Sequence, residues 1–172
     1  MFIVFLNLVF SLIAILILIG VIIFLIPAVR WLPFVPSEKD RVGTMVELAR
    51  IKPGEKAVDL GSGDGRIVIA LAQTGAEAHG YEINPLLVWW SRYRIKRAGL
   101  TDKAFIHQKD FWQEDLSQYQ LVVIYGISFI MSRLEKKLTK ELKSGARVVI
   151  NDAVFPNLKY SQKQDKVYLY RI

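Results

Sequence analysis

The N-terminal segment of the chain is continuously apolar. Between Phe2 and Ile26 no side chain is charged, and Ile, Leu, Val and Phe make up nearly all of the run. A helix of this length rises about 37 Å at about 1.5 Å per residue, which exceeds a hydrocarbon core of about 30 Å. The pattern predicts a single transmembrane anchor over residues 1–29. A cleaved signal peptide is disfavoured, because no basic region precedes the run and no small-residue cleavage site follows it.

A proline-rich stretch follows the apolar run. Three prolines between Pro27 and Pro36 argue against a continuing straight helix, so we interpret residues 30–36 as a linker. Ser37 to Asp40 has the form of a capping box, and apolar positions recur at helical spacing as far as Arg50. A folded domain is therefore expected over residues 37–172.

Short apolar runs then alternate with segments of helical periodicity. The expected strands are Ala57–Leu60, Ala78–Tyr81, Ala104–His107, Leu121–Tyr125, Arg147–Ile150 and Val167–Ile172, and the expected helices are Ile67–Gln73, Leu86–Ala98 and Phe129–Leu142. Residues 153–165 show no helical periodicity. This order predicts an α/β fold with an open, doubly wound, Rossmann-like sheet.

Charge and composition narrow the functional classes. Cysteine is absent, which excludes a disulfide scaffold, a thiol nucleophile and a zinc–thiolate site. The net charge of +7 is compatible with nucleic acid or with anionic lipid. The basic residues of segment 92–97 suit lipid headgroups, whereas those of segment 133–143 fit a solvated helix face paired with Glu135 and Glu141. We expect a lipid bilayer as a partner, and neither nucleic acid nor metal.

The distribution of basic residues also predicts an orientation. They lie only on the C-terminal side of the apolar run, beginning with Arg30. The positive-inside rule then places the folded domain of a single-pass membrane protein on the cytosolic side or its mitochondrial-matrix equivalent.

A glycine-rich turn follows the first strand of the domain. The sequence Asp59-Leu60-Gly61-Ser62-Gly63-Asp64-Gly65 runs from an apolar strand into the start of a helix, where glycines let a ligand approach the backbone. A dinucleotide fingerprint would need glycine or alanine at position 66, which is Arg66. Nicotinamide and flavin cofactors are therefore disfavoured.

Acids stand at the ends of the first three strands. Glu82 lies where a carboxylate can accept both ribose hydroxyls, Asp110 can accept from an adenine amine beside an aromatic ring, and Asp59 suits an α-amino group. Asp59 or Asp110 alone could equally be a strand-end cap. Together the three acids predict S-adenosylmethionine as the cofactor. The candidate cofactor-binding residues are Asp59, Gly61, Gly63, Glu82, Asn84, Asp110 and Phe111.

From Pro33 to its C-terminus the sequence resembles class I methyltransferases, and specifically the small membrane-anchored protein lysine methyltransferases. Members of this family act on the adenine nucleotide translocase and on the c subunit of ATP synthase. The most diagnostic motif is Leu87-Val88-Trp89-Trp90-Ser91-Arg92-Tyr93-Arg94. Where relatives carry F-P-x-P-x-W, this chain reads Phe155-Pro156-Asn157-Leu158-Lys159-Tyr160, and Ser128 replaces a frequent proline. Both departures fall on the expected acceptor side.

The resemblance implies methylation of a lysine on a membrane-associated protein. Deprotonating a lysine at neutral pH costs about 4–5 kcal/mol, which an apolar, aromatic slot beside a cationic cofactor would lower. Tyr125 and Asn151 are the candidate catalytic residues lining that slot, with Phe155 as a wall, and His79 and His107 are taken as structural. Two alternatives stay open: methylation of a lipid-soluble small molecule such as a quinone or lipid headgroup, and a non-catalytic S-adenosylmethionine-binding membrane module.

Overall fold

The computed structural model describes residues 2–30 and 39–172, with side chains described for residues 6–7, 9–21 and 41–172. The chain divides into two compact units, Met1–Val35 and Pro36–Ile172. Most of the linker expected over residues 30–36 and the start of the capping box at Ser37 lie outside the described residues.

In the first unit, residues 2–30 form the helix α1 (Phe2–Arg30). It continues through Pro27 as far as Arg30, the first residue of the expected linker. A proline removes a single helical hydrogen bond, and the neighbouring bonds are sufficient to complete the last turn. Within the residues whose side chains are described, no helix is long and apolar enough to cross a membrane.

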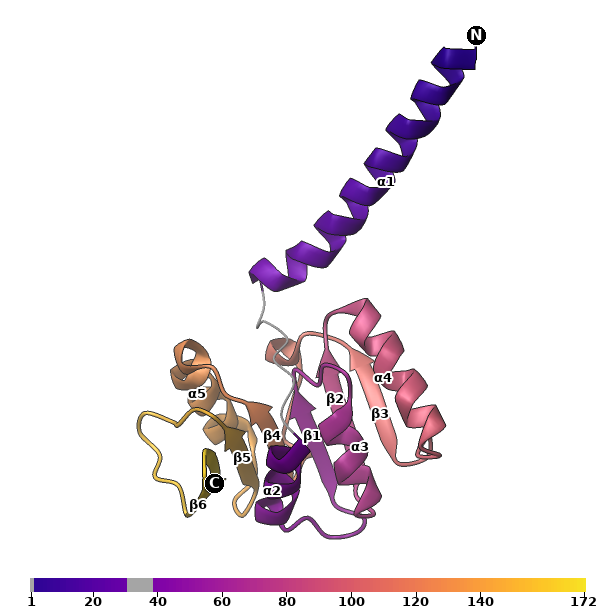
Figure 1. Ribbon diagram of the computed structural model, residues 1–172. Coiled ribbons are helices and arrows are strands. Elements are labelled where there is room, and N and C mark those ends of the chain that lie inside the picture. The colour runs from indigo at the N-terminus through magenta and orange to yellow at the C-terminus, as the bar shows by residue number, and fades with distance from the viewer. Residues whose placement is uncertain (1, 31–38) are drawn as a thin grey trace. The chain divides into compact units, whose positions relative to one another are not determined.

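The second unit is built on a mixed sheet, which the described residues form from seven strands in the order β3-β2-β1-β4-β5-β7-β6 (Figure 1). The strands are β1 (Lys56–Leu60), β2 (Glu77–Glu82), β3 (Ala104–Gln108), β4 (Leu121–Tyr125), β5 (Arg147–Asn151), β6 (Gln162–Gln164) and β7 (Val167–Arg171). Strands β1 to β5 are parallel, and β7 runs antiparallel to both β5 and β6. The expected α/β fold with an open sheet is confirmed.

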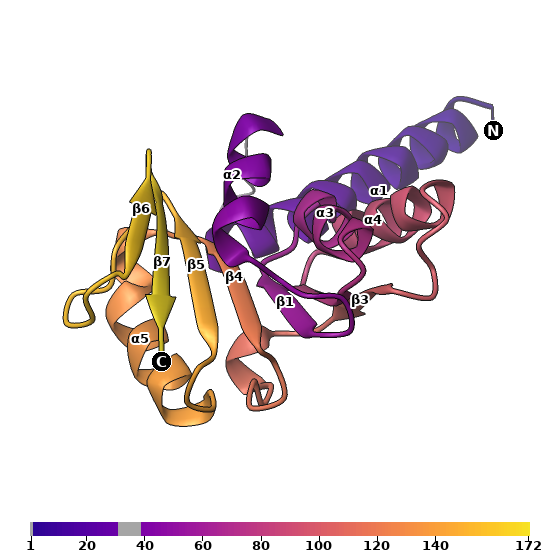
Figure 2. The same cartoon turned by 90° about the horizontal axis from the view of Figure 1, so that it is seen from below.

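Helices cover both faces of this sheet (Figure 2). They are α2 (Lys39–Ala49), α3 (Arg66–Gln73), α4 (Pro85–Arg97) and α5 (Met131–Glu141), with single 3-10 turns at η1 (Phe111–Gln113) and η2 (Ser128–Ile130). Apolar side chains of α2, α3 and α4 share one buried core with alternate residues of the central strands. Leu134 and Leu138 of α5 are fully buried outside that core, so α5 packs on the opposite face.

The expected elements are observed with shifts of one or two residues, apart from one strand. The helix expected from Phe129 begins with the turn η2, and α5 itself starts at Met131. Strand β6 lies in the stretch 153–165, where no element was expected. Its sequence, Gln-Lys-Gln, is polar, and it is an edge strand that pairs with β7, so no apolar alternation marked it.

Candidate active site

The candidate site lies at the carboxyl edge of the parallel strands, where the strand order reverses between β1 and β4. The turn after β1 is tied to the end of β2, because the amides of Gly61 and Ser62 both donate to the carbonyl of Tyr81, at 2.9 and 3.0 Å. Gly61 has φ +80°, and no described atom lies within 4 Å of where its Cβ would be. The backbone at Gly61 is therefore open to a ligand.

The far end of the same turn is packed against α4. Gly65 has φ +76°, and a Cβ there would lie 2.7 Å from the Cβ of Ser91. The Ser91 hydroxyl, which is fully buried, donates to the carbonyl of Gly63 at 3.1 Å. Any side chain at position 65 would push α4 away from the turn.

Glu82, at the end of β2, is held by backbone donors. Its Oε2 accepts from the amide of Gly63 at 2.9 Å, and its Oε1 accepts from the amides of Ile83 and Asn84, both at 2.8 Å. A carboxylate offers about four acceptor sites, so these bonds orient the group and leave acceptor capacity for a ligand. The expected role toward ribose hydroxyls fits this geometry.

Asp64 was not singled out from the sequence, yet it links the turn to two helices. Arg66 approaches it through two bonds, of 2.9 and 2.8 Å, and Arg94 of α4 lies 2.5 Å away. Burial pushes the pKa of the Asp64 carboxyl upward, but the two guanidinium groups outweigh it and leave this pKa below its ordinary value. The Asp-x-Arg spacing was a local signal for Arg66. Arg94 is distant in sequence and gave none.

Asp59, by contrast, has no such cation beside it in the described part of the chain. It lies within β1 at 2% exposure. Burial first, and the negative charges of Glu82 and Asp64 second, raise the pKa of its carboxyl from 3.8 to about 8. Nearby, the hydroxyl of Ser62 is buried with no hydrogen-bond partner among the described residues. These groups are placed to receive a cationic ligand that also donates hydrogen bonds.

Asp110 caps the 3-10 turn η1, and Asn84 caps helix α4. Oδ1 of Asp110 accepts from the amide of Trp112 at 3.0 Å, and Oδ1 of Asn84 accepts from the amide of Leu86 at 3.0 Å. The strand-end cap considered for Asp110 is therefore present, and Oδ2 of that residue is left for a ligand. Phe111 is 6% exposed and its ring lies 4.7 Å from that of Trp112, so Phe111 offers little area to an adenine.

The candidate catalytic residues are direct neighbours across two strands. Tyr125 of β4 pairs in register with Asn151 of β5. The Tyr125 hydroxyl donates to Oδ2 of Asp152 at 3.1 Å, and Asp152 also forms ion pairs with Lys166 at 3.3 Å and Arg41 at 3.8 Å. Asp152, which sequence reasoning missed, therefore positions Tyr125.

Asn151 is buried completely, and neither its Nδ2 nor its Oδ1 has a hydrogen-bond partner among the described residues. A buried amide in this state costs about 1–3 kcal/mol. Such a group at the edge of a ligand site is poised to bond a substrate or a water molecule.

The loop after β5 completes the acceptor side. Phe155 is 4% exposed, its ring lies 4.7 Å from that of Tyr170, and its amide donates to the Tyr170 hydroxyl at 3.1 Å. The buried Glu135 of α5 accepts from the amides of Asn157 and Leu158, at 3.2 and 2.8 Å. Glu135 thereby fastens the loop after β5 to α5.

The two histidines interact with each other, and one of them with Glu77. Nδ1 of His79 lies 2.9 Å from Nε2 of His107, and Nε2 of His79 lies 3.0 Å from a Glu77 oxygen. The pKa of His107 is lowered, chiefly by burial and then by His79. No group of three metal-ligating side chains gathers within the described part of the chain.

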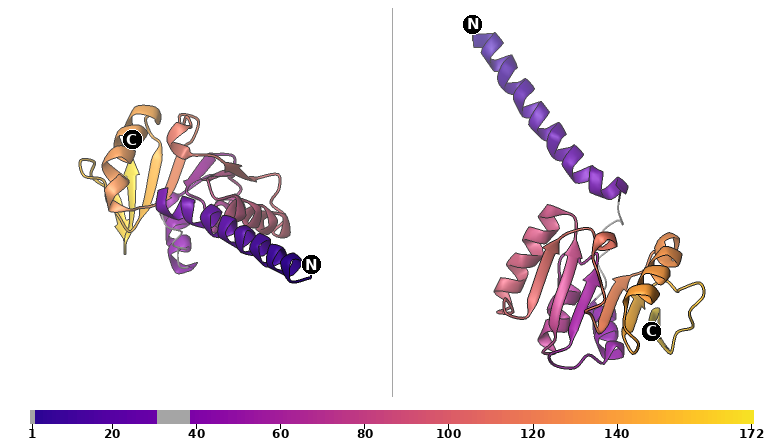
Figure 3. Two further views of the ribbon diagram at one scale, coloured as in Figure 1. Left: turned by 90° about the horizontal axis from the view of Figure 1, so that it is seen from above. Right: turned by 180° about the vertical axis from the view of Figure 1, so that it is seen from behind.

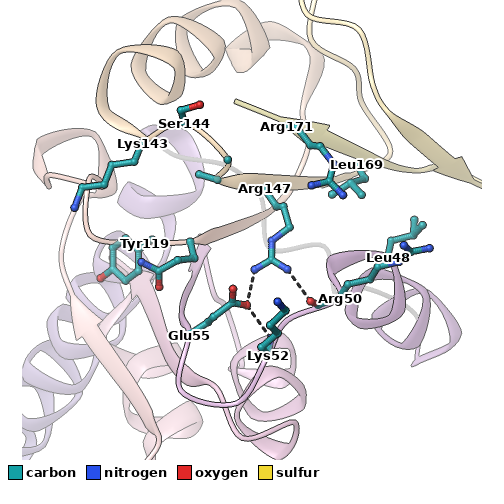
Figure 4. Close-up of a pocket in the computed structure, with 13 residues that line it drawn as sticks. Leu48, Arg50, Lys52, Glu55, Tyr119, Lys143, Ser144, Arg147, Leu169 and Arg171 are labelled. Atoms are coloured by element: carbon teal, nitrogen blue, oxygen red, sulfur yellow. Dashed lines mark hydrogen bonds and ion pairs between the residues drawn. The ribbon is translucent and has the colours of Figure 1, made fainter.

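A pocket of about 510 Å³ occupies the opposite edge, at the amino ends of the strands (Figure 4). Its centre is Arg147, which donates to the carbonyls of Ala49 and Arg50 and lies 2.5 Å from Glu55. These bonds join α2 to the sheet. The pocket shares no residue with the candidate site.

The strand order, the antiparallel β7 and the acid-flanked glycine turn at the switch point together define a class I methyltransferase fold. Residues 59–162 match the ANTKMT methyltransferase domain family. The chain belongs to this family.

Several relatives carry informative names. The mouse lysine N-methyltransferase named for the c subunit of ATP synthase is 49% identical over 135 residues, which cover 77% of this chain and 54% of that protein. The mouse adenine nucleotide translocase lysine N-methyltransferase is 37% identical and covers 86% of this chain and 66% of its own length. A protein-lysine N-methyltransferase of Saccharolobus islandicus is 34% identical over 70% of this chain and 76% of its own. The chain spans little more than half the length of the first of these.

Solved structures show the same fold. An RNA methyltransferase from Salinibacter ruber, crystallised with S-adenosyl-L-homocysteine, has a TM-score of 0.78 at 36% identity and covers 80% of this chain and 94% of its own. A methyltransferase from Thiobacillus denitrificans has a TM-score of 0.61 at 20% identity, covering 74% and 54%. The latter similarity concerns the fold alone.

Proposed function

We propose that this protein transfers a methyl group from S-adenosylmethionine to a lysine side chain of a membrane-associated protein. The observation that carries the proposal is the buried Asp59, whose pKa is raised to about 8 beside two other acids. A cation stabilises the anionic form of a carboxyl in this position, and the ammonium and sulfonium groups of S-adenosylmethionine both supply positive charge.

The remaining residues of the turn fit the same cofactor. Gly61 leaves room for its approach, Glu82 presents a pre-oriented carboxylate to the ribose, and Asp110 keeps one oxygen for the adenine amine. The site needs neither a phosphate-binding lysine nor a phosphate-binding loop, because this nucleoside has no phosphate. When bound, S-adenosylmethionine supplies an activated methyl group on a cationic sulfur.

The acceptor side must present a neutral amine in line with that methyl group. A slot beside Tyr125, Asn151 and Phe155 would withhold water from a lysine ammonium and lower its pKa. A neutral lysine amine held in this slot would accept the activated methyl group that S-adenosylmethionine would supply, and the ammonium product would release one proton to solvent. The protein contributes orientation and desolvation, so no dedicated base is required.

The names of the relatives support lysine as the acceptor. Two vertebrate enzymes named for the c subunit of ATP synthase and for the adenine nucleotide translocase, and an archaeal enzyme named for protein lysine, all match this chain over most of its length. The motif Trp89-Trp90-Ser91 lies inside the matched region.

The proposal includes attachment to a membrane through the N-terminal segment. Residues 2–26 carry no charge, and they belong to a helix of 29 residues. We propose that this apolar segment anchors the chain in a bilayer. Basic residues on its C-terminal side favour a cytosolic or matrix location for the catalytic unit.

One experiment tests the acceptor. Purified membranes are incubated with the full chain and tritiated S-adenosylmethionine, and the label is then followed through protease, organic-solvent and nuclease treatments. We expect label that is released by protease and appears as methyl-lysine after hydrolysis. Label in the solvent extract would indicate a lipid-soluble acceptor, and label released by nuclease would indicate RNA. Either result would overturn the lysine assignment.

Two variants serve as controls in that assay. Asp59→Asn removes the carboxylate that we place beside the cofactor and should abolish labelling. Glu55→Gln changes a carboxylate that lies at the opposite edge of the sheet and should leave labelling intact. Full labelling by Asp59→Asn would contradict the proposed cofactor site.

A further inference from the structure

Helix α4 exposes an unusual outward face. Its large apolar side chains Leu86, Trp89, Trp90 and Tyr93 are 60%, 65%, 44% and 43% exposed. These positions follow helical spacing, and Lys96 and Arg97 continue the same stripe. Together these six residues form what we call the α4 stripe. Buried tryptophans are the norm in a folded domain, so two exposed ones side by side indicate a partner.

The α4 stripe is separate from the face through which α4 packs on the domain. The inward face of α4 is formed by Val88, Ser91 and Ile95, all nearly or fully buried. Through that face α4 packs beside β3 and β2 at one end of the sheet, as the rear view in Figure 3 shows. The aromatic residues are therefore additional to the packing of the domain.

The aromatic rings are ordered against one another. The centroids of Trp89 and Tyr93 lie 6.2 Å apart with planes 10° from parallel, and those of Trp90 and Tyr93 lie 5.5 Å apart. The guanidinium of Arg97 lies 6.0 Å above the Tyr93 ring. The stripe thus presents a continuous ring surface that ends in cations.

The charges on α4 indicate an anionic partner. No acidic residue occurs between Glu82 and Asp102. Of the basic residues on α4, Arg92 donates to the carbonyl of Ile106 and Arg94 pairs with Asp64, so both serve the domain itself. Lys96 and Arg97 are exposed and available to an anionic surface.

Tryptophan and tyrosine beside lysine and arginine form the composition that prefers the boundary between headgroups and acyl chains of a bilayer. We propose that the α4 stripe binds the surface of an anionic lipid bilayer, with its aromatic rings at that boundary and its cations among the phosphates. This surface acts on its own chemistry, whether or not α1 crosses the membrane.

The location of the stripe has a consequence for the reaction. Leu86 lies in the first turn of α4, which begins at Pro85, just after Glu82 at the end of β2 and the N-cap Asn84, at the carboxyl edge of the sheet. Two further exposed apolar residues follow the strands of the acceptor side at that edge, Phe129 at 78% and Val154 at 46% exposure. Binding through the stripe would hold this edge, and hence the acceptor slot, near the membrane surface.

Quenching by brominated lipids tests the inference on the full chain. One variant carries Trp31→Phe and Trp112→Phe, so that Trp89 and Trp90 alone report. A matched variant carries Trp31→Phe, Trp89→Phe and Trp90→Phe, so that Trp112 alone reports. Both are mixed with vesicles of phosphatidylcholine and phosphatidylglycerol, with or without bromine on the acyl chains, and flotation measures how much chain is bound.

We expect bromine to reduce Trp89 and Trp90 emission by about half, as for rings about 5–10 Å into the boundary, and to leave Trp112 unchanged. Adding Lys96→Glu and Arg97→Glu, or omitting phosphatidylglycerol, should weaken the quenching.

Three results would overturn the inference. The first is a chain that floats with vesicles while Trp89 and Trp90 remain unquenched. That result would mean that another segment binds the bilayer and the α4 stripe does not. The second is a chain that does not float at all. The third is quenching that is equal for Trp112. If Trp89 and Trp90 change only when a purified acceptor protein is added, the stripe is a protein-docking face.

Discussion

The cofactor half of the carboxyl edge, formed by β1 and β2, and the acceptor half, formed by β4 and β5, are held by different kinds of bonds. On the cofactor half, the amides of Gly61 and Ser62 bond to the backbone carbonyl of Tyr81, and only the amide of Gly63 relies on a side chain, that of Glu82. On the acceptor half, the amide of Gly126 bonds to the carbonyl of Asn151, but side chains hold the groups that line the slot: Asp152 holds Tyr125, and Glu135 holds the loop after β5.

This difference indicates which half can vary. Backbone bonds persist through most substitutions, so a shared cofactor can be kept while sequences diverge. A bond that a side chain accepts is lost when that side chain is replaced, as the bond from the Leu158 amide would be on replacement of Glu135. We therefore expect changes on the two halves to separate cofactor binding from acceptor use.

The largest expected effect is on Glu82. Glu82→Gln replaces one oxygen with an amide that cannot accept from Gly63 or from a ribose hydroxyl. Lost charge-assisted bonds of about 1.5–3 kcal/mol each should weaken binding of S-adenosylhomocysteine by about 100-fold or more. Calorimetry measures this, with Glu55→Gln as the control at the other edge of the sheet. An unchanged Kd would show that Glu82 does not touch the cofactor.

Asp59→Asn should act on stability in the direction set by its pKa. Folding raises this pKa to about 8, so the folded chain holds a proton that the unfolded chain has released, and wild-type stability falls as pH rises from about 4 to 8. Asparagine does not ionise, so the variant should not lose stability in this way. The variant should melt on the order of 5 °C above wild type at pH 9, with the difference vanishing toward pH 4. A constant difference in Tm across this range would contradict the raised pKa.

The same carboxyl should make cofactor binding depend on pH in the wild type. A bound cation favours the ionised form, so S-adenosylmethionine should bind more tightly as pH rises from about 6 to 8 and should displace a proton at about pH 7. Calorimetry in buffers of different ionisation enthalpy counts that proton. In Asp59→Asn the proton release should disappear.

Glu135→Ala should disturb the acceptor half and leave the cofactor half intact. It leaves the amides of Asn157 and Leu158 without their acceptor, which should cost about 1–3 kcal/mol of folding stability. We expect a higher KM for the acceptor and an unchanged Kd for S-adenosylhomocysteine. Asn157→Ala removes only the side-chain bond of that residue and is the matched control. Equal loss of cofactor affinity would mean that the two halves are coupled.

The smallest effect is expected for Tyr125→Phe. The change removes a hydrogen bond to Asp152 worth about 0.5–1.5 kcal/mol but keeps the aromatic wall. If the slot works by desolvation, kcat should fall by less than about tenfold and its pH profile should keep its shape. A much larger loss, with a shifted profile, would assign the Tyr125 hydroxyl a direct role in proton transfer.

The sequence by itself determined the alternation of strands and helices and the positions of most of their ends. Buried parallel strands such as β1 and β4 are apolar throughout most of their length, and helices such as α3 carry apolar residues at helical spacing, so local patterns suffice. The turn at Gly61 and the strand-end position of Glu82 were visible for the same reason. Strand β6 was not, because a polar edge strand has no local signal.

Only the tertiary structure decided how the acids of the site differ. Asp64 and Asp59 lie close together in the sequence, yet guanidiniums lower the pKa of the first, while burial beside other acids raises the pKa of the second to about 8. Asn151 is likewise an ordinary strand-end residue in the sequence and, among the described residues, an unpartnered buried amide in the fold. Burial, and charges brought from distant segments such as Arg94, set these properties, and neither is encoded in the spacing of neighbouring residues.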